Sequence, residues 1–212
     1  MDLYSIDMKD VKSRSGSLRA EHAAVTRNRI ERSARSLFAS GGYGATTLRE
    51  IAAGAGVAVQ TIYAVYGSKA NILRALRDAL VSDPAADAAY AEALAARATA
   101  DAMTAFARSI RLRWEAGFDV VQIHGDAASV DPAIREEATR ALDGRRRGIA
   151  ALARSIARLD PRLADQDRTT AILDALTLPE VYGNLVGIHG WPADAYETWL
   201  AAALRLLVGG PI

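Results

Sequence analysis

The sequence predicts an all-α protein, because hydrophobic residues recur at helical spacing and no stretch alternates with the period of two that a strand requires. Hydrophobic residues make up 50% of the 212-residue chain and charged residues 24%, which is typical of a soluble globular protein. Glycine and proline mark short helices in the N-terminal third and long helices beyond it. We therefore expect a small N-terminal helical domain followed by a larger helical bundle.

The chain begins with scattered charges and little periodicity, so residues 1–16 are expected to form a mobile arm. The first domain is predicted to cover residues 17–74 and the second residues 75–212. Residues 1–74 contain 11 Lys or Arg against 6 Asp or Glu, a net charge of +5, whereas the remainder carries −4. A basic domain on an acidic body favours attraction of phosphate to the N-terminal end.

Three helices are predicted to follow a first amphipathic helix that runs from about Ser17 to Ser40. Thr47 and Glu50 have the spacing of a capping box, which opens the next helix, and Gly56 ends it. A short helix is then expected at about 59–65, and a last one begins at Lys69.

The two short helices are predicted to share one apolar seam, formed by Leu48, Ile51, Ala52, Ala55, Val57, Ile62 and Val65. With this seam buried, the second helix turns its other face to solvent, carrying Val59, Gln60, Thr61, Tyr63 and Ala64. Ala58, directly before this helix, has no side chain that could act as an N-cap.

The stretch from Ile30 to Leu73 resembles the DNA-binding domain of the TetR family of regulators. The resemblance rests on A-R-x-L-F, G-Y, T-T-L-R-E-I-A, A-G-V, T-I-Y-x-x-Y and G-S-K, which occur in this order at the family's spacings. It implies a three-helix helix-turn-helix domain, with the motif at about residues 46–66, and a C-terminal helical bundle for ligand binding and dimerisation. The partners implied are double-stranded operator DNA, a small-molecule effector and a second copy of the chain.

The resemblance also implies roles for individual residues. Arg49 and Gln60 are expected to reach base edges, where an Arg fork suits guanine, and Val59 to approach thymine methyl groups. The expected phosphate contacts, which position the protein without reading sequence, are Thr47, Thr61, Tyr63 and Lys69. Packing within the domain is the alternative for Tyr63, and it is the favoured interpretation for Tyr66, against the first helix.

In the C-terminal domain, Asp131-Pro132 is predicted to open a helix that runs to about Leu159, and a second helical stretch should span about 166–188 with an interruption at Pro179. Residues 176–200 also resemble the C-terminal part of one TetR-like subgroup. In TetR-like regulators the corresponding helices pack against their symmetry mate, which implies a dimer interface formed by Ile149, Leu152, Ile156, Ile172, Leu176, Val181 and Leu185.

A ligand pocket is expected between the helices that link the two parts, around a helix break at Gly117. Its candidate lining residues, each of which has the alternative of being plain core, are Met103, Phe106, Ile110, Trp114, Phe118 and His124. The three histidines are far apart in the sequence and no carboxylate accompanies them at helical spacing, so no metal is expected, and no cofactor.

We therefore expect a homodimeric repressor of a palindromic operator that a small-molecule ligand releases. An activator or a ligand-independent regulator of the same fold is the alternative, and a helical interaction protein is a remoter one. An enzyme is disfavoured because the chain has no Gly-rich phosphate loop and no G-x-S-x-G motif. The absence of cysteine and of any apolar run of about 18 residues favours a cytoplasmic protein without a membrane span.

Overall fold

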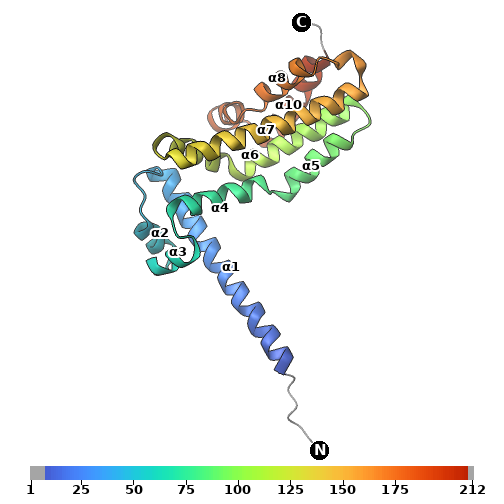
Figure 1. The fold of residues 1–212 in the computed structure, drawn as a ribbon. Coiled ribbons are helices and arrows are strands. Elements are labelled where there is room, and N and C mark those ends of the chain that lie inside the picture. The colour runs from blue at the N-terminus through green and yellow to red at the C-terminus, as the bar shows by residue number, and fades with distance from the viewer. Residues whose placement is uncertain (1–7, 210–212) are drawn as a thin grey trace, which may run out of the picture. The chain divides into compact units, whose positions relative to one another are not determined.

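The structure is a computed structural model that describes residues 8–209, with side chains from Ala20 onward, and every regular element in that range is helical. The all-α prediction is therefore confirmed. None of the helices in this part of the chain is long and apolar enough to cross a membrane. The elements in chain order (Figure 1) are α1 (Met8–Gly41), α2 (Leu48–Ala55), α3 (Val59–Val65), α4 (Lys69–Val81), α5 (Pro84–Ala95), α6 (Thr99–Val130), α7 (Pro132–Leu159), η1 (Pro161–Leu163), α8 (Gln166–Leu176), α9 (Pro179–Tyr182), η2 (Gly183–Ile188) and α10 (Ala193–Gly209).

The first helix begins earlier than the hydrophobic periodicity indicates. It starts at Met8, inside the range expected to be an arm, and the first seven residues of that expected arm lie outside the described residues. Lys, Arg and Met favour helix intrinsically even where no apolar stripe marks the helix. A search for amphipathic spacing therefore places the start too late.

The chain divides into two compact units, residues 1–76 and 77–212, and the division falls inside α4. In the first unit, α2 packs on α1 and α3 packs on α2. Ile30, Ala34 and Phe38 of α1 are buried there, together with Ile51, Ala52 and Ala55 of α2. Helix α2, packed on α1, thus supports the short α3.

The second unit is built around α6, which contacts α5, α7, α9 and α10, as Figure 1 shows for the long helices that run beside it. Its core includes Met103, Phe106 and Ile110 of α6. Distant segments are tied together by Tyr90, whose hydroxyl donates to the Gly148 carbonyl at 2.8 Å, and by Ser155, whose hydroxyl donates to the Leu94 carbonyl at 3.1 Å. These bonds hold α5 against α7.

The predicted breaks in the second unit are present. Gly117 has non-helical angles within α6, and Asp131 caps α7, accepting from the amides of Ala133 and Ile134. Pro179 divides the expected 166–188 stretch into α8, the short α9 and a π-helical segment, η2. The proline has no N–H to continue α8, and π-helical segments are often found at functional sites.

Candidate nucleic-acid interface

The start of α2 is fixed by a reciprocal hydrogen-bonded cap, as the sequence predicts. The Thr47 hydroxyl accepts from the Glu50 amide at 3.2 Å, and the Thr47 amide donates to the Glu50 carboxylate at 2.8 Å. The Thr47 hydroxyl also donates to the Glu50 carboxylate at 2.8 Å, and the two bonds that this carboxylate accepts, from the Thr47 amide and hydroxyl, lower the pKa of Glu50 from its ordinary value. The charged form of Glu50 is therefore favoured, and with it the orientation of Thr47 and the first turn of α2.

The seam between α2 and α3 contains most of the predicted residues. Ile51, Ala52, Ala55 and Ile62 are buried, whereas the predicted member Val65 is 41% exposed. Val65 is therefore a correction: α3 ends at this residue, and the chain turns away at Gly67 before a further turn of helix could cover it. The tight stop of α2 uses Gly56, whose φ of +62° lies in the left-handed region that favours glycine.

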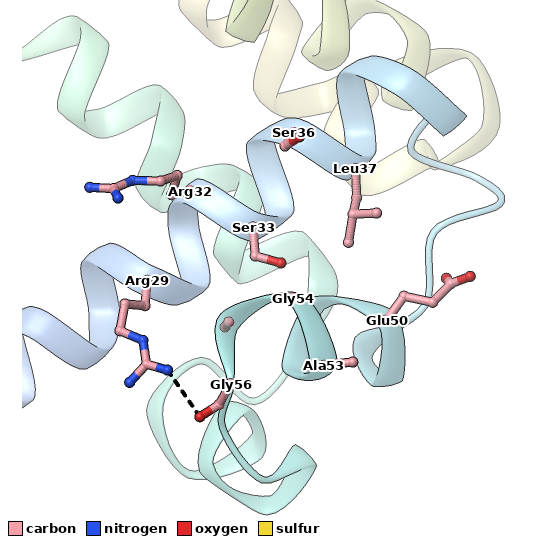
Figure 2. A pocket seen from close by; sticks show the side chains of 10 residues that line it. Arg29, Arg32, Ser33, Ser36, Leu37, Glu50, Ala53, Gly54 and Gly56 are labelled. Atoms are coloured by element: carbon pink, nitrogen blue, oxygen red, sulfur yellow. Dashed lines mark hydrogen bonds between the residues drawn. The ribbon is translucent and has the colours of Figure 1, made fainter.

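Helix α1 supports α2 through polar contacts that sequence reasoning missed. The Ser33 hydroxyl donates to the Ile51 carbonyl at 3.0 Å, and the Arg29 guanidinium donates to the Gly56 carbonyl at 3.1 Å (Figure 2). A Cβ atom at Gly54 would clash with the Ser33 hydroxyl, so glycine allows this close approach. Arg29 and Ser33 are four residues apart on one helix face, which is the signal that could have found them.

An open groove of about 620 Å³ lies between α1 and α2, as Figure 2 shows. Its lining combines Arg29 and Arg32 of α1 with Glu50 and small residues of α2. Arg29 and Ser33 in this lining bind backbone carbonyls of Gly56 and Ile51, and Glu50 belongs to the cap of α2, so these three residues are already engaged in holding α2 in place.

The face of α3 opposite the seam is open to solvent. Gln60, Tyr63 and Ala64 are exposed, and their spacing of three and four residues puts them on one face of the helix. Val59 and Thr61 are half-buried beside them, and Thr47 and Arg49 are exposed at the start of α2. Ala58 makes no side-chain cap, as its residue type requires.

Tyr66 and Lys69 make hydrogen bonds within the first unit. The Tyr66 hydroxyl donates to the Glu31 carboxylate of α1 at 2.6 Å, which agrees with the predicted packing against the first helix. Burial, followed by this hydrogen bond and the charge of Glu31, raises the pKa of Tyr66. The Lys69 ammonium donates to the carbonyls of Tyr43 at 2.6 Å and Thr46 at 2.8 Å, so it is half-buried against the loop before α2.

All six residues expected to line a ligand site lie on α6. Met103, Phe106, Ile110, Trp114 and His124 are buried in the second unit, and Phe118 is half-buried. Trp114 Nε1 and His124 Nε2 have no hydrogen-bond partner among the described residues, and the same holds for the hydroxyl of Tyr196 on α10. Sequence reasoning missed Tyr196, which lies in α10 about 70 residues beyond the last of the six candidates on α6.

The residues expected at a dimer interface fall into two groups. Ile149, Leu152 and Ile156 of α7 are at most 3% exposed in the core of their own unit, so they have no surface to offer a second copy. The other group is half-buried at the edge of that core: Ile172, Leu176, Val181 and Leu185. The broad apolar face of α7 is explained by contacts with α5, α6 and α8, which the sequence pattern alone does not distinguish from an interface.

A short helix held on a capped partner, with one polar face open to solvent, defines a helix-turn-helix protein of the class that places its second helix in the DNA major groove. Residues 30–76 match the family model described as "Bacterial regulatory proteins, tetR family". Residues 30–76 therefore form a DNA-binding domain of the kind found in TetR-family bacterial regulators.

Solved structures share its fold. The TetR family regulator PfmR from Thermus thermophilus is 20% identical, with 88% of this chain and 97% of that chain covered at a TM-score of 0.65. A TetR-family protein from Mesorhizobium loti is 18% identical, with 88% and 96% covered at a TM-score of 0.63. A transcriptional regulator from Saccharomonospora viridis, in complex with choline, is 22% identical, with 84% and 95% covered at a TM-score of 0.57. No match was found among curated proteins.

Proposed function

We propose that the chain is a cytoplasmic, homodimeric repressor that binds a palindromic operator and is released from it by a small molecule. The observation that carries the DNA-binding part is the exposed face of α3 held on the capped helix α2. An activator would use the same face and the same dimer, so the sign of the response is the part of this proposal that needs a direct measurement. No enzymatic activity is proposed.

On DNA, α3 would enter the major groove with Gln60 toward base edges and Val59 beside thymine methyl groups. Arg49 is exposed in the first turn of α2, from which its guanidinium would reach guanine. Thr47, Thr61 and Tyr63 would contact phosphates and so fix the register of the helix. The exposure of Tyr63, 58%, favours this role over packing within the domain.

A dimer is supported by apolar side chains that the second unit leaves in water. Leu206 is 71% exposed and Leu207 45% on α10, which packs against α8, where Ile172 and Leu176 are half-buried. Val181 and Leu185, which follow Pro179 in the sequence, are also half-buried at the edge of the core. We assign the interface to this surface, without the buried residues of α7. A two-fold interface of this kind would present two copies of α3 to a palindrome.

The proposed effector site lies in the core around α6, α9 and α10. The Phe118 ring is 5.6 Å from that of Tyr182, which is 5.0 Å from that of Tyr196. Trp114 lies four residues before Phe118, on the other side of the break at Gly117, and its indole N–H and the Tyr196 hydroxyl are buried donors. Because buried donors are normally paired, we propose an effector with an apolar body and an oxygen acceptor. The six candidates on α6 remain the proposed lining, joined by Tyr196.

Helix α4 would carry the response, since it runs without a break from the first unit into the second. Its last turn is held on α6: the Arg113 guanidinium donates to the carbonyl of Val81 at 2.9 Å, and Leu80 packs against Gly117. The Arg77 guanidinium is 2.9 Å from the Glu137 carboxylate of α7. An effector that moves α6 near its break would therefore displace the end of α4, and the population of the DNA-binding arrangement would change with it.

The experiment begins by selecting duplexes from a random library with the full-length protein. Fluorescence anisotropy then compares a selected duplex with a shuffled one. We expect palindromic selected sites with a specificity ratio of about a thousandfold or more at physiological salt. Equal affinity for both duplexes would contradict sequence-specific binding, and selected sites without a dyad would contradict the homodimer.

The response to an effector is tested on the same complex. Benzoate supplies an apolar body with oxygen acceptors, and choline, the ligand in the Saccharomonospora viridis structure, supplies a quaternary ammonium that aromatic rings bind. We expect oxygen acceptors to raise the melting temperature and release the duplex, and Tyr196→Phe to weaken this effect. A response to choline alone would contradict the proposed chemistry. A reporter gene behind the selected site distinguishes a repressor from an activator.

A further inference from the structure

Lys69 lies just beyond the recognition helix, and its ammonium binds the loop that precedes α2. It donates to three carbonyl oxygens, those of Tyr43 at 2.6 Å, Thr46 at 2.8 Å and Gly44 at 3.4 Å. The same nitrogen lies 4.3 Å from the centre of the Tyr43 ring. An ammonium has three N–H donors, and this loop offers an acceptor for each of them.

The helix that carries Lys69 does not favour a positive charge at this position. Lys69 is the first residue of α4, where the helix dipole disfavours a positive charge. The three carbonyl dipoles and the aromatic face compensate for that cost. The charge is therefore oriented toward the protein's own backbone, whereas a phosphate contact would orient it toward DNA.

We propose that Lys69 is a positioning residue. It ties the start of α4, which follows α3, to the loop before α2, and thereby fixes the positions of Thr47 and Arg49. This rests on the proposed mode of DNA reading. It replaces the phosphate contact that the resemblance implies for Lys69.

The carbonyl of Thr46 links Lys69 directly to the cap of α2. It belongs to the same peptide group as the Thr47 amide, which donates to the Glu50 carboxylate at 2.8 Å. Hydrogen bonds on both ends of one peptide group polarise and strengthen each other. Removal of the ammonium would weaken the cap of α2. Arg49, two residues after Thr47, would then no longer be held in a fixed position.

The loop before α2 contains no regular helix at residues 42–47. Its other described anchors include the Thr46 amide and hydroxyl, which both donate to the Gly42 carbonyl, and the packing of Tyr43 on Phe38. The segment closed by Lys69 runs from Tyr43 to the first residue of α4 and contains α2 and α3 whole. A single side chain thus ties together the two ends of the DNA-reading segment.

The test compares Lys69→Met with the full-length wild type on a duplex that the wild type selects, across a range of salt concentrations. A lost phosphate contact would reduce the slope of log K against log salt by about 0.9. We expect a change in slope of less than about 0.3, together with a loss of about tenfold in the specificity ratio over a shuffled duplex. A slope reduced by about one unit with an unchanged ratio would overturn the proposal.

Two further variants keep this test decisive. Arg32→Met removes one positive charge from the same unit and controls for net charge, so its specificity ratio should equal that of the wild type. Lys69→Arg retains the charge but not the compact three-donor head. We expect it to retain the salt slope and lose specificity, whereas full retention of both would indicate a phosphate contact.

Hydrogen exchange of the free protein gives a readout that needs no DNA, and it applies if Lys69→Met is less stable. We expect the amides of Thr47 and Glu50 to exchange at least about fivefold faster in Lys69→Met and Lys69→Arg than in Arg32→Met, as local opening becomes easier. Unchanged exchange at these amides would overturn the proposal. Failure of the wild type to select any duplex would instead contradict the proposed function.

Discussion

The two units of the chain differ in how their geometry is encoded. In the DNA-reading unit, α2 begins at a cap formed by two residues three positions apart and ends at a glycine with positive φ. In the second unit, the decisive contacts join distant segments, such as the 2.8 Å ion pair between Arg111 and Glu197. The reading site is thus fixed by local chemistry, and the proposed effector site by packing across the whole bundle.

The largest expected effect concerns the apolar face of α7 in the second unit. Leu152 is fully buried, so Leu152→Ala should lower the free energy of unfolding by about 2–5 kcal/mol through lost burial and a cavity. Urea denaturation at two protein concentrations measures this. A core residue predicts the same loss at both concentrations, whereas a loss that disappears at high concentration would return Leu152 to the interface. The matched comparison is Leu206→Ala in the proposed interface, 71% exposed in the single chain, whose effect should depend on protein concentration.

The next effect distinguishes a loss of DNA binding from a loss of stability in the first unit. Arg49 is exposed, so Arg49→Ala should weaken binding of a selected duplex by about 1–3 kcal/mol and leave the melting temperature unchanged. Fluorescence anisotropy with single-base variants of the duplex locates the affected position. If affinity falls equally on all duplexes, Arg49 contacts phosphate and the assignment of base reading is wrong.

A smaller effect is expected from the missing side-chain cap of α3. Helix α3 starts at Val59, and Ala58 before it provides no side-chain cap, so Ala58→Ser should stabilise the helix by about 0.5–1 kcal/mol. Slower amide exchange in α3 reports the gain. The control, Ala64→Ser, places the same residue type inside the helix, where it caps nothing. Equal exchange in both variants would show that packing on α2, and not the cap, limits the order of α3.

The smallest effect is a pH dependence in the second unit. Burial, followed by the charge of Arg77, lowers the pKa of His124 from its ordinary value of 6.5, and Glu137 acts in the opposite sense. The unfolded chain takes up a proton near pH 6.5 that the folded chain resists, so His124 reduces stability as the pH falls below that value. His124→Gln should have a smaller loss of melting temperature between about pH 7.5 and pH 5.5 than the wild type. The exposed His189→Gln is the control, and an equal loss in both variants would contradict this cause.

The same comparison explains what the sequence predicts well. The capping box at Thr47, the stop at Gly56, the opening of α7 at Asp131-Pro132 and the break at Gly117 are all local, and all are present. The exposed face of α3 follows from the helical spacing of Gln60, Tyr63 and Ala64.

Contacts across the chain account for what the sequence could not predict. The burial of Leu152 depends on helices that are far from it in the sequence. The Tyr196 hydroxyl, which has no hydrogen-bond partner within residues 20–208, becomes evident only when α10 lies on α6. The partners of Lys69 require the path of the loop before α2, which hydrophobic periodicity does not describe.

The central claim, that the open face of α3 reads DNA, is tested most directly by an NMR titration of the full-length protein with a selected duplex. The account predicts that amide signals of residues 47–66 shift and saturate, with the largest changes at Arg49, Gln60 and Tyr63, and that a shuffled duplex leaves them nearly unchanged at moderate salt. Shifts confined to residues 99–209, or equal shifts with both duplexes, would contradict it.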